Sequence, residues 1–332
     1  MRSESPALNA WENTPRTGEH AKHGGLEEAL KALNDRLRAG LPNAPPVPLS
    51  EEPIIFIVGC ARSGSTLLFQ VLAAGGDFCY PTNFISRFFA DPVTGALAQR
   101  ALHDLDHKGE IFPQRSGAKS FTSELGRAKG AVEPHDFGYF WKFHFAFGAH
   151  QGELVGPVQE GPASPLVLAL RGMQGVFGQP LVMKAMQMDW HLHILERSFP
   201  NCVFLHIERD PYDNALSLLE ARRKYFGDVG KWYSFKPPQY AAIKDLAPME
   251  QALAQVHYTN LAVREQLDRM PKDRWLHLDY SALCADPGAT RARVLKMIGR
   301  EPLSDGPERF PQRSHADVDA RKRAHDFLAG LE

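Results

Sequence analysis

The stretch IIFIVGCARSGSTLLFQVLAA, residues 54–74, decides how this chain folds. Its first part, Ile54–Val58, is a short apolar run rich in β-branched residues, which is typical of a strand buried on both faces. Its last part, Ser65–Ala74, predicts a helix, and a turn rich in Gly and Ser joins the two. A buried strand that leads through such a turn into a helix is the opening unit of a parallel α/β sheet.

The turn itself has the spacing of a phosphate-binding loop, G-x-x-x-x-G-K-[ST], with Ser65 in place of the lysine. Its glycines let the backbone approach an anion closely, and its N–H groups and the start of the helix supply donors. In nucleotide triphosphatases the missing lysine neutralises the β- and γ-phosphates, so its absence favours a less charged terminal group. The residues expected to bind the ligand are Arg62, Ser63, Gly64, Ser65 and Thr66.

A second strand–helix–strand unit runs from LVMK at 181–184 to CVFLHIE at 202–208 and predicts a second anion site. Arg209 follows its last strand, and Ser217 lies two turns into the next helix. Because ligands bind at the carboxyl ends of parallel strands, we expect Arg209 and Ser217 to converge on one phosphate. Two separate anion sites imply a nucleotide with phosphate groups on both ends of its ribose.

Residues 80–175, rich in aromatics, Gly and His, show no clear pattern. After Arg209 the chain repeats the alternation, with a helix expected at 249–269, a strand at 275–280 and a helix capped by Asp286 and Pro287. The predicted fold is therefore α/β, with three layers: a mostly parallel central sheet, helices on both faces and a P-loop-like nucleotide cradle. The predicted organisation is a polar segment, a helix over 26–39 and a Pro-rich linker in residues 1–50, then one α/β domain over residues 51–332.

Composition narrows the classes of partner. The 332 residues carry 38 basic and 39 acidic side chains, so no bulk charge attracts nucleic acid or an acidic membrane. No apolar run approaches the roughly 18 residues needed to span a bilayer. The four cysteines lie far apart, and the first residues lack the apolar core of a secretory signal, so we expect a cytoplasmic protein with free thiols.

These motifs resemble those of the sulfotransferases that use 3′-phosphoadenosine 5′-phosphosulfate. The segment ARSGST at 61–66 is similar to that family's phosphosulfate loop, and the spacing of Arg209 and Ser217 is that of its 3′-phosphate segment. Lys184 stands at the end of a strand, ahead of Phe-Pro and the strand to Arg209, as in many members. Tyr280 resembles the late tyrosine that lies by the adenine. The resemblance covers about residues 53–300.

The resemblance implies a reaction and a set of roles. A sulfuryl group would pass from 3′-phosphoadenosine 5′-phosphosulfate to a hydroxyl or amine, leaving adenosine 3′,5′-bisphosphate, with no metal required. Lys184 would be catalytic, stabilising the leaving phosphate. The acceptor would be a small molecule, a glycan or a lipid. Its identity and the oligomeric state are open.

The base that takes the acceptor's proton is where the sequence departs from the family. Some relatives place a histidine two residues after the strand lysine, where this chain has Met186, and others use a glutamate shortly after the first helix, where residues 77–83 contain none. The segment EPHD at 133–136 is the densest alternative, and we take His135 from it as the catalytic candidate, with His191 and His193 as rivals.

Two other functions remain open at this stage. One is a kinase or nucleotide triphosphatase on the same loop, which would need magnesium and for which Glu208 could imitate a metal-binding acidic strand end. The other is a protein that binds the nucleotide but has lost its base and transfers nothing.

Overall fold

Four parallel strands form one sheet in the order β2-β1-β3-β4, as predicted for this fold class. The computed structural model describes residues 16–17, 24–40, 47–112, 121–304, 307, 309–312 and 314–331. The chain moves from β1 to β2 on one side and then to β3 on the other. The gap between β1 and β3 is therefore a topological switch point, where such sheets bind ligands. The strands are β1 (Ile54–Val58), β2 (Leu181–Lys184), β3 (Val203–Glu208) and β4 (Trp275–Asp279).

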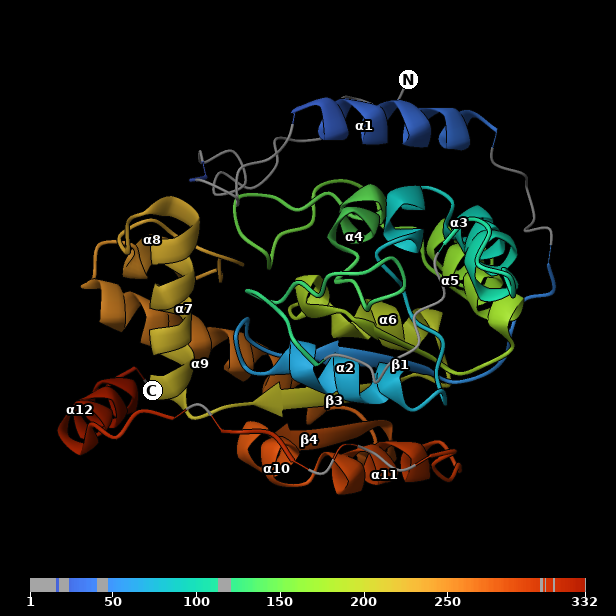
Figure 1. Ribbon diagram of the computed structural model, residues 1–332. Helices are drawn as coiled ribbons and strands as arrows, with labels where there is room; N and C mark the ends of the chain where they lie inside the picture. Colours follow the sequence, from blue (N-terminus) through green and yellow to red (C-terminus); the bar gives the residue numbers. More distant parts are fainter. Residues whose placement is uncertain are drawn as a thin grey trace.

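Helices lie on both faces of the sheet and beyond its ends (Figure 1). In the view of Figure 1, α1, α3, α4 and α5 lie above the strands, and α10 and α11 lie below them. The α-helices are α1 (Gly24–Ala39), α2 (Ser65–Ala74), α3 (Pro92–Gln99), α4 (Gly138–His144), α5 (Pro165–Phe177), α6 (Leu192–Ser198), α7 (Pro211–Phe226), α8 (Tyr240–Ile243), α9 (Pro248–Leu267), α10 (Tyr280–Ala285), α11 (Pro287–Met297) and α12 (Val318–Ala329).

Three 3₁₀ turns and one π-turn complete the described elements. The helix expected between the strands at 181–184 and 202–208 is the short α6 (Leu192–Ser198), and a 3₁₀ turn (Met186–Met188) precedes it. These elements are the 3₁₀ turns Ile85–Phe88, Met186–Met188 and Lys272–Arg274 and the π-turn Arg100–Asp104.

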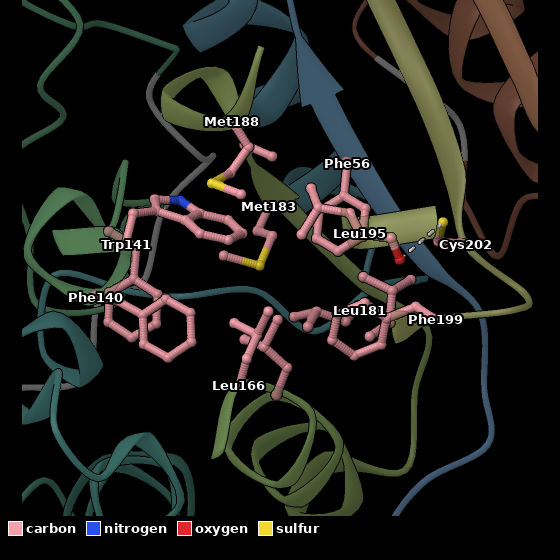
Figure 2. Close-up of a cluster of buried hydrophobic side chains, with 14 of the residues drawn as sticks. Phe56, Phe140, Trp141, Leu166, Leu181, Met183, Met188, Leu195, Phe199 and Cys202 are labelled. Carbon is pink, nitrogen blue, oxygen red and sulfur yellow. Dashed lines mark hydrogen bonds between the residues drawn. The ribbon is translucent and has the colours of Figure 1, made fainter. Parts of the chain in front are cut away.

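The central strand β1 divides the core into two layers. Phe56 points to one face and packs with residues of α4, α5 and α6, while Ile55 and Ile57 point to the other face and pack with α2, α10 and α11. Figure 2 shows the first layer, in which Phe56, Trp141 and Phe199 surround the β2 residue Met183. All five side chains of β1 are fully buried. The apolar run that predicted a strand covered on both faces is confirmed.

Four helices begin with the same local sequence, a small polar residue followed by proline. The cap side chain of α3, α5, α7 and α11 accepts a hydrogen bond from the backbone N–H three residues later, and the proline occupies the first helical position. Asp286 of α11 is the cap predicted from the sequence. These caps fix where each helix starts, and the cap of α7 directly follows Arg209 of the predicted site. The pairs are Asp91-Pro92, Ser164-Pro165, Asp210-Pro211 and Asp286-Pro287.

The predicted N-terminal helix is present as α1. Leu30 and Asn34 are its buried positions, while Leu26 and Leu33 from the predicted apolar face are exposed. The Asn34 amide donates to the carbonyl of Arg87 at 2.9 Å, which docks α1 on the following turn. Most of the predicted polar segment and linker, residues 1–15, 18–23 and 41–46, lies outside the described residues, and the boundary at residue 50 stays a prediction.

Candidate functional site

Each of the four strands ends at a residue or loop that the sequence singled out. The loop Gly59–Thr66 follows β1, Lys184 closes β2, Arg209 follows β3, and Tyr280 follows β4. Because all four strands are parallel, these carboxyl ends lie along one edge of the sheet. The sheet topology therefore brings together residues that are more than 200 positions apart in the sequence.

The loop Gly59–Thr66, which we call the cradle, has the backbone of an anion-binding nest. Arg62 and Gly64 both adopt left-handed conformations, with φ of 70° and 101°, so successive N–H groups turn to one side. The Ser63 side chain is fully buried, and its hydroxyl has no hydrogen-bond partner among the described residues. A buried donor left unsatisfied costs free energy, so the cradle has the features of a site that is completed by a ligand.

Three side chains hold the cradle from outside. Asp189 accepts a hydrogen bond from the Gly59 N–H at 3.1 Å, and Asn260 accepts one from the Cys60 N–H at 3.2 Å. The Asn214 amide donates to the carbonyl of Ala61 at 2.8 Å. Complete burial raises the pKa of the Asp189 carboxyl well above its usual value. These contacts fix the first three residues of the cradle. The sequence analysis assigned no role to these three residues: Asp189 and Asn260 lie in no motif, and Asn214, although it lies between Arg209 and Ser217, is not one of the residues that define that motif.

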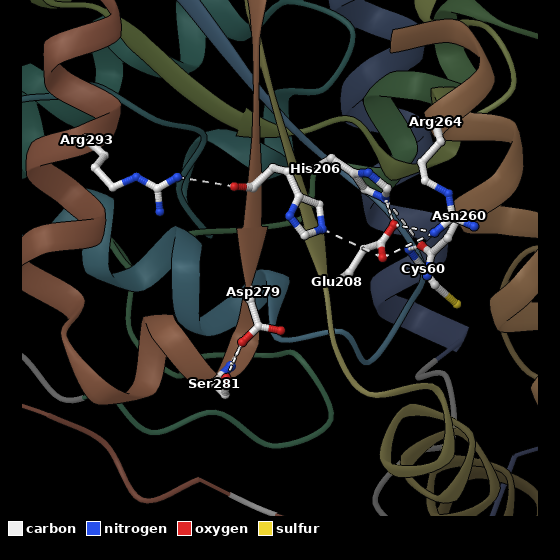
Figure 3. Close-up of polar contacts among 9 residues, drawn as sticks. Cys60, His206, Glu208, Asn260, Arg264, Asp279, Ser281 and Arg293 are labelled. Atoms are coloured by element: carbon white, nitrogen blue, oxygen red, sulfur yellow. Dashed lines mark hydrogen bonds and ion pairs between the residues drawn. The ribbon is translucent and has the colours of Figure 1, made fainter. Parts of the chain in front are cut away.

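Glu208 is the candidate magnesium ligand for a kinase or nucleotide triphosphatase, and its carboxylate is bonded to basic side chains. Its carboxylate contacts Arg264 at 3.0 Å, His206 at 3.2 Å and His277 at 3.7 Å. Figure 3 shows Glu208 with His206 and with the α9 residues Asn260 and Arg264. Burial acts to raise the pKa of Glu208, but its basic neighbours outweigh burial and lower it. Among the described residues no cluster of three His, Cys, Asp or Glu side chains is arranged to hold a metal ion.

The two predicted anion sites are joined by a direct contact. The Arg62 Nε donates to the Ser217 hydroxyl at 3.2 Å, so the cradle and α7 meet. The Arg209 guanidinium lies 4.9 Å from the centre of the Tyr280 ring. Burial lowers the pKa of the Arg209 guanidinium, and the charge of Arg62 acts in the same direction. Two arginines thus share one region at the β1–β3 switch point.

Gly64 makes the contact between the cradle and Tyr280 possible. A Cβ atom at Gly64 would lie 2.3 Å from Cδ2 of the Tyr280 ring, far inside contact distance. The ring of Tyr280 therefore packs directly on the cradle backbone and carries Arg209 on its plane. Through this stack Arg209, after β3, and Tyr280, after β4, both reach the cradle, which follows β1.

Lys184 lies between the cradle and a carboxylate. Its ammonium donates to the Thr66 hydroxyl at 2.6 Å and pairs with Oδ1 of Asp136 at 2.7 Å. Its side chain is only 5% exposed. The Trp141 indole N–H donates to the Lys184 carbonyl at 3.0 Å, which fixes the end of the strand. A buried lysine that contacts the anion loop is placed to act on a bound anion.

Two extended segments carry Asp136 to Lys184. Residues 79–83 continue the sheet past β2, with the Val182 N–H bonded to the Cys79 carbonyl at 3.0 Å. Residues 131–135 pair in turn with residues 81–84, with the His135 N–H bonded to the Pro81 carbonyl at 2.9 Å. These pairings involve single bridges rather than regular strands, so they leave no periodic signal in the sequence.

His135, the predicted catalytic histidine, lies next to Asp136 in this layer. Its Nδ1 accepts a hydrogen bond from the Phe137 N–H at 2.9 Å. Burial and the surrounding cations lower its pKa to about 4. The rival His191 is buried with Nε2 2.9 Å from the Gln151 carbonyl, and His193 is exposed.

A tight hairpin lies over the cradle from the same segment. Glu124 and Arg127 exchange two backbone hydrogen bonds of 2.9 Å, and the turn residues Leu125 and Gly126 have φ of 49° and 89°. Positive φ at both positions makes this a turn of the tight hairpin class. A Cβ at Gly126 would lie 3.3 Å from the Thr66 hydroxyl. We call residues 121–136 the covering segment, since it contacts both Thr66 and Lys184. The sequence analysis singled out only its last four residues, 133–136.

No helix among the described residues has the length and apolar character needed to cross a membrane. A comparison of the sequence with curated proteins gave no match. A profile described as "Sulfotransferase family" matches residues 53–305.

Solved structures give a similar picture for the fold. The chain is similar to sulfotransferase STF9 from Mycobacterium avium at 13% identity and a TM-score of 0.51, covering 96% of this chain and 79% of that one. It is also similar to sulfotransferase STF1 from Mycobacterium tuberculosis at 13% identity and a TM-score of 0.49, covering 92% and 76%. A sulfotransferase from Alicyclobacillus acidocaldarius matches at 15% identity and a TM-score of 0.45, covering 84% and 92%.

Proposed function

Because this chain belongs to the sulfotransferase family, we propose that it transfers a sulfuryl group from 3′-phosphoadenosine 5′-phosphosulfate to a hydroxyl or amine of an acceptor. The acceptor class is a small molecule, a glycan or a lipid. The observation that carries the proposal is that Arg62 of the cradle contacts Ser217 and lies close enough to Arg209 to act on its pKa, so the basic residues predicted for two anion sites lie together at one switch point. A nucleotide with phosphates on both ends of its ribose fits two such sites.

The residues proposed to hold the donor fit an anion. The cradle residues Arg62, Ser63, Gly64, Ser65 and Thr66 would bind the 5′-phosphosulfate through backbone N–H groups and hydroxyls. The buried, unpartnered hydroxyl of Ser63 supports this assignment. Arg209 and Ser217 would bind the 3′-phosphate, and Tyr280 would lie by the adenine. Ser217 already contacts Arg62, which supports a continuous site for both ends of one nucleotide.

The proposed chemistry depends on fixed positive charge. The donor, when bound, supplies an activated sulfuryl group. The Lys184 ammonium, held on the Thr66 hydroxyl, would stabilise negative charge on the leaving phosphate. In this proposal the arginines and the lysine supply the positive charge, backbone N–H groups donate hydrogen bonds, and no metal is required. The base is taken from the segment 133–136, in which His135 is the residue predicted from the sequence and Asp136 the one in contact with Lys184.

We also infer a reducing cellular location. All four cysteines are buried and none is in a disulfide, which fits a cytoplasmic protein.

Calorimetric titration with adenosine 3′,5′-bisphosphate tests the proposal. We expect saturable binding, weaker by about 1.5–3 kcal/mol for adenosine 5′-monophosphate, which lacks the group that Arg209 would bind. The same protein is then incubated with labelled donor and a panel of phenols, amines, sugars and lipids, and transfer of label is measured. Absence of binding at millimolar bisphosphate contradicts the proposal. Binding without transfer to any acceptor favours a nucleotide-binding protein, and magnesium-dependent ATP turnover favours a kinase.

A further inference from the structure

We propose that Asp136 accepts the proton of the acceptor group in the transfer reaction, a role that rests on the proposed function and makes this carboxylate a catalytic residue. The basis is its contact with Lys184, whose ammonium also donates to the Thr66 hydroxyl of the cradle. The lysine Nζ lies 2.6 Å from Thr66 Oγ1 and 2.7 Å from Asp136 Oδ1. A group stabilised by Lys184 therefore lies within reach of Asp136.

Lys184 and Asp136 differ in solvent exposure, and a proton acceptor has to be the more accessible of the two. The Lys184 side chain is 5% exposed, whereas the Asp136 side chain is 55% exposed. The lysine is thus enclosed with the cradle, and the carboxylate faces outward from it. An acceptor approaching from solvent meets Asp136 before Lys184. Since Oδ1 is engaged with the ammonium, Oδ2 is the atom assigned to the incoming hydroxyl or amine.

The same anchors hold both residues, so their spacing is built into the fold. Phe137, which follows Asp136, is buried and stacks on Phe140 at 4.6 Å between ring centres. Trp141, on the same helix α4, donates its indole N–H to the carbonyl of Lys184. The helix that starts after Asp136 therefore bonds directly to the end of the strand that carries Lys184. Preorganisation of this kind is what a proton acceptor needs.

The neighbouring His135 can donate a hydrogen bond to an acceptor group but cannot take its proton. His135 Nδ1 accepts from the Phe137 N–H, so the neutral ring carries its proton on Nε2. A neutral imidazole in this tautomer donates from its other nitrogen and has no lone pair there to accept a proton. Its pKa is lowered to about 4 by burial first and then by nearby cations, which keeps it neutral. His135 is suited to orient an acceptor oxygen, and Asp136 to take its proton.

The charges around Asp136 keep it ionised at neutral pH. Enclosure by protein acts to raise its pKa, but the Lys184 ammonium outweighs this and lowers it, with smaller contributions from His135 and Arg127. The charge of Asp136 also acts on Tyr233, in the loop after α7, where it adds to burial in raising the pKa of the phenol to about 12. A carboxylate is a weak base toward a free alcohol. It becomes adequate as the alcohol oxygen bonds to sulfur and its proton becomes acidic.

The step balances without any further reactant. The acceptor oxygen forms a bond to sulfur, and the bond between sulfur and the bridging phosphate oxygen breaks. The electron pair of that bond stays on the phosphate oxygen, where Lys184 stabilises the charge. The acceptor proton passes to Asp136 Oδ2 and leaves to solvent after product release. For an amine acceptor, the same proton comes from nitrogen.

The variant Asp136→Asn tests this role, since its amide oxygen still accepts from Lys184 but cannot take a proton. We expect the enzyme-dependent release of sulfate from the donor, with water as acceptor, to fall by about 10²–10³-fold, with a similar fall for any acceptor found. Affinity for adenosine 3′,5′-bisphosphate, measured by calorimetry, should change by less than about threefold, which is under 0.7 kcal/mol. In Asp136→Ala, added formate should restore part of the rate, with chloride as the salt control.

The matched control is His135→Asn, whose side-chain oxygen retains the bond to the Phe137 N–H. We expect a smaller loss of rate than in Asp136→Asn. If the histidine variant loses the large factor and Asp136→Asn stays within threefold of the unmodified protein, the base is His135 and the inference is wrong. If Asp136→Asn loses nucleotide affinity as well as rate, Asp136 is a positioning residue for Lys184. If the unmodified protein binds no bisphosphate, the proposed function itself has failed.

Discussion

The cradle and the covering segment contact each other at Thr66, yet they are built in opposite ways. The cradle, Gly59–Thr66, lies between a fully buried strand and a helix, and its partners Arg209 and Tyr280 follow two other strands of the same sheet. The covering segment, residues 121–136, contains a tight hairpin and single bridges to residues 81–84. The comparison teaches that regular structure positions the proposed donor site, whereas irregular structure positions the proposed proton acceptor, Asp136.

This division suits the proposed function, in which the donor is one nucleotide and the acceptor is held by a separate part of the site. Regular strands set backbone positions within tight limits, because backbone hydrogen bonds join each central strand to a strand on either side. Irregular segments accept substitution and insertion without disturbing the sheet. The residue that would act on the donor, Lys184, lies at the seam, since it contacts Thr66 of the cradle and Asp136 of the covering segment.

The largest effect is expected at that seam. Lys184→Met keeps the buried stem and removes the ammonium, so the transfer rate should fall by about 10²–10³-fold, as for loss of one donor to a developing anion. Lys142→Met on α4 is the control, because the Lys142 ammonium lies over the Tyr139 ring, 5.9 Å from its centre. Label transfer from the donor measures both. A rate within tenfold of the unmodified protein would remove Lys184 from the mechanism.

Much of the cradle was predictable because its signals are local. The run Ile54–Val58, the glycine spacing of the loop and the Asp-Pro start of α7 each lie within a few residues, and each is confirmed as structure. The contact between Arg62 and Ser217 was not predicted. It depends on how α7 crosses the end of the sheet, which no local pattern encodes.

The covering segment was unpredictable for a different physical reason. Its position is set by Cys79 pairing with Leu181 and Thr82 pairing with Pro134, two isolated bridges without a periodic pattern. Its turn uses Leu125 at positive φ, where Asn or Gly is usual, so the turn signal is weak. The sequence therefore identified the segment 133–136 as rich in candidates. The structure was needed to show that Asp136 contacts Lys184.

The second prediction tests whether Arg62 and Arg209 bind the two ends of one nucleotide. Arg62→Ala and Arg209→Ala should each weaken binding of adenosine 3′,5′-bisphosphate by about 1.5–3 kcal/mol, the worth of a charged hydrogen bond. Arg264→Ala is the control, because this arginine on α9 pairs with Glu208 at 3.0 Å. Calorimetry measures all three. Unchanged affinity in both cradle-side variants would end the model of two anion sites.

A smaller effect is expected from one added methyl group in the cradle. In Gly64→Ala the Cβ overlaps the Tyr280 ring, and φ of 101° is strained for alanine, so unfolding free energy should fall by about 1–3 kcal/mol. Displacement of Tyr280 should also weaken bisphosphate binding by about tenfold, or 1.4 kcal/mol. Urea unfolding and calorimetry are the measurements.

Gly76→Ala separates strain from contact in that experiment. Gly76 has φ of 79° but nothing within 4 Å of an added Cβ. It should lose stability to a similar degree and keep its nucleotide affinity. Equal loss of affinity in both variants would mean that Tyr280 is not held by the cradle.

The smallest effect separates the covering segment from the cradle. In Gly126→Ala the added Cβ lies 3.3 Å from the Thr66 hydroxyl, a contact that the hairpin can relieve by shifting outward. Because φ is 89°, we expect a loss of about 1 kcal/mol in unfolding free energy. Bisphosphate affinity should stay within about threefold, since the cradle itself is unchanged. A loss of affinity as large as that of Gly64→Ala would show that the hairpin is part of the donor site, and that the two regions act as one.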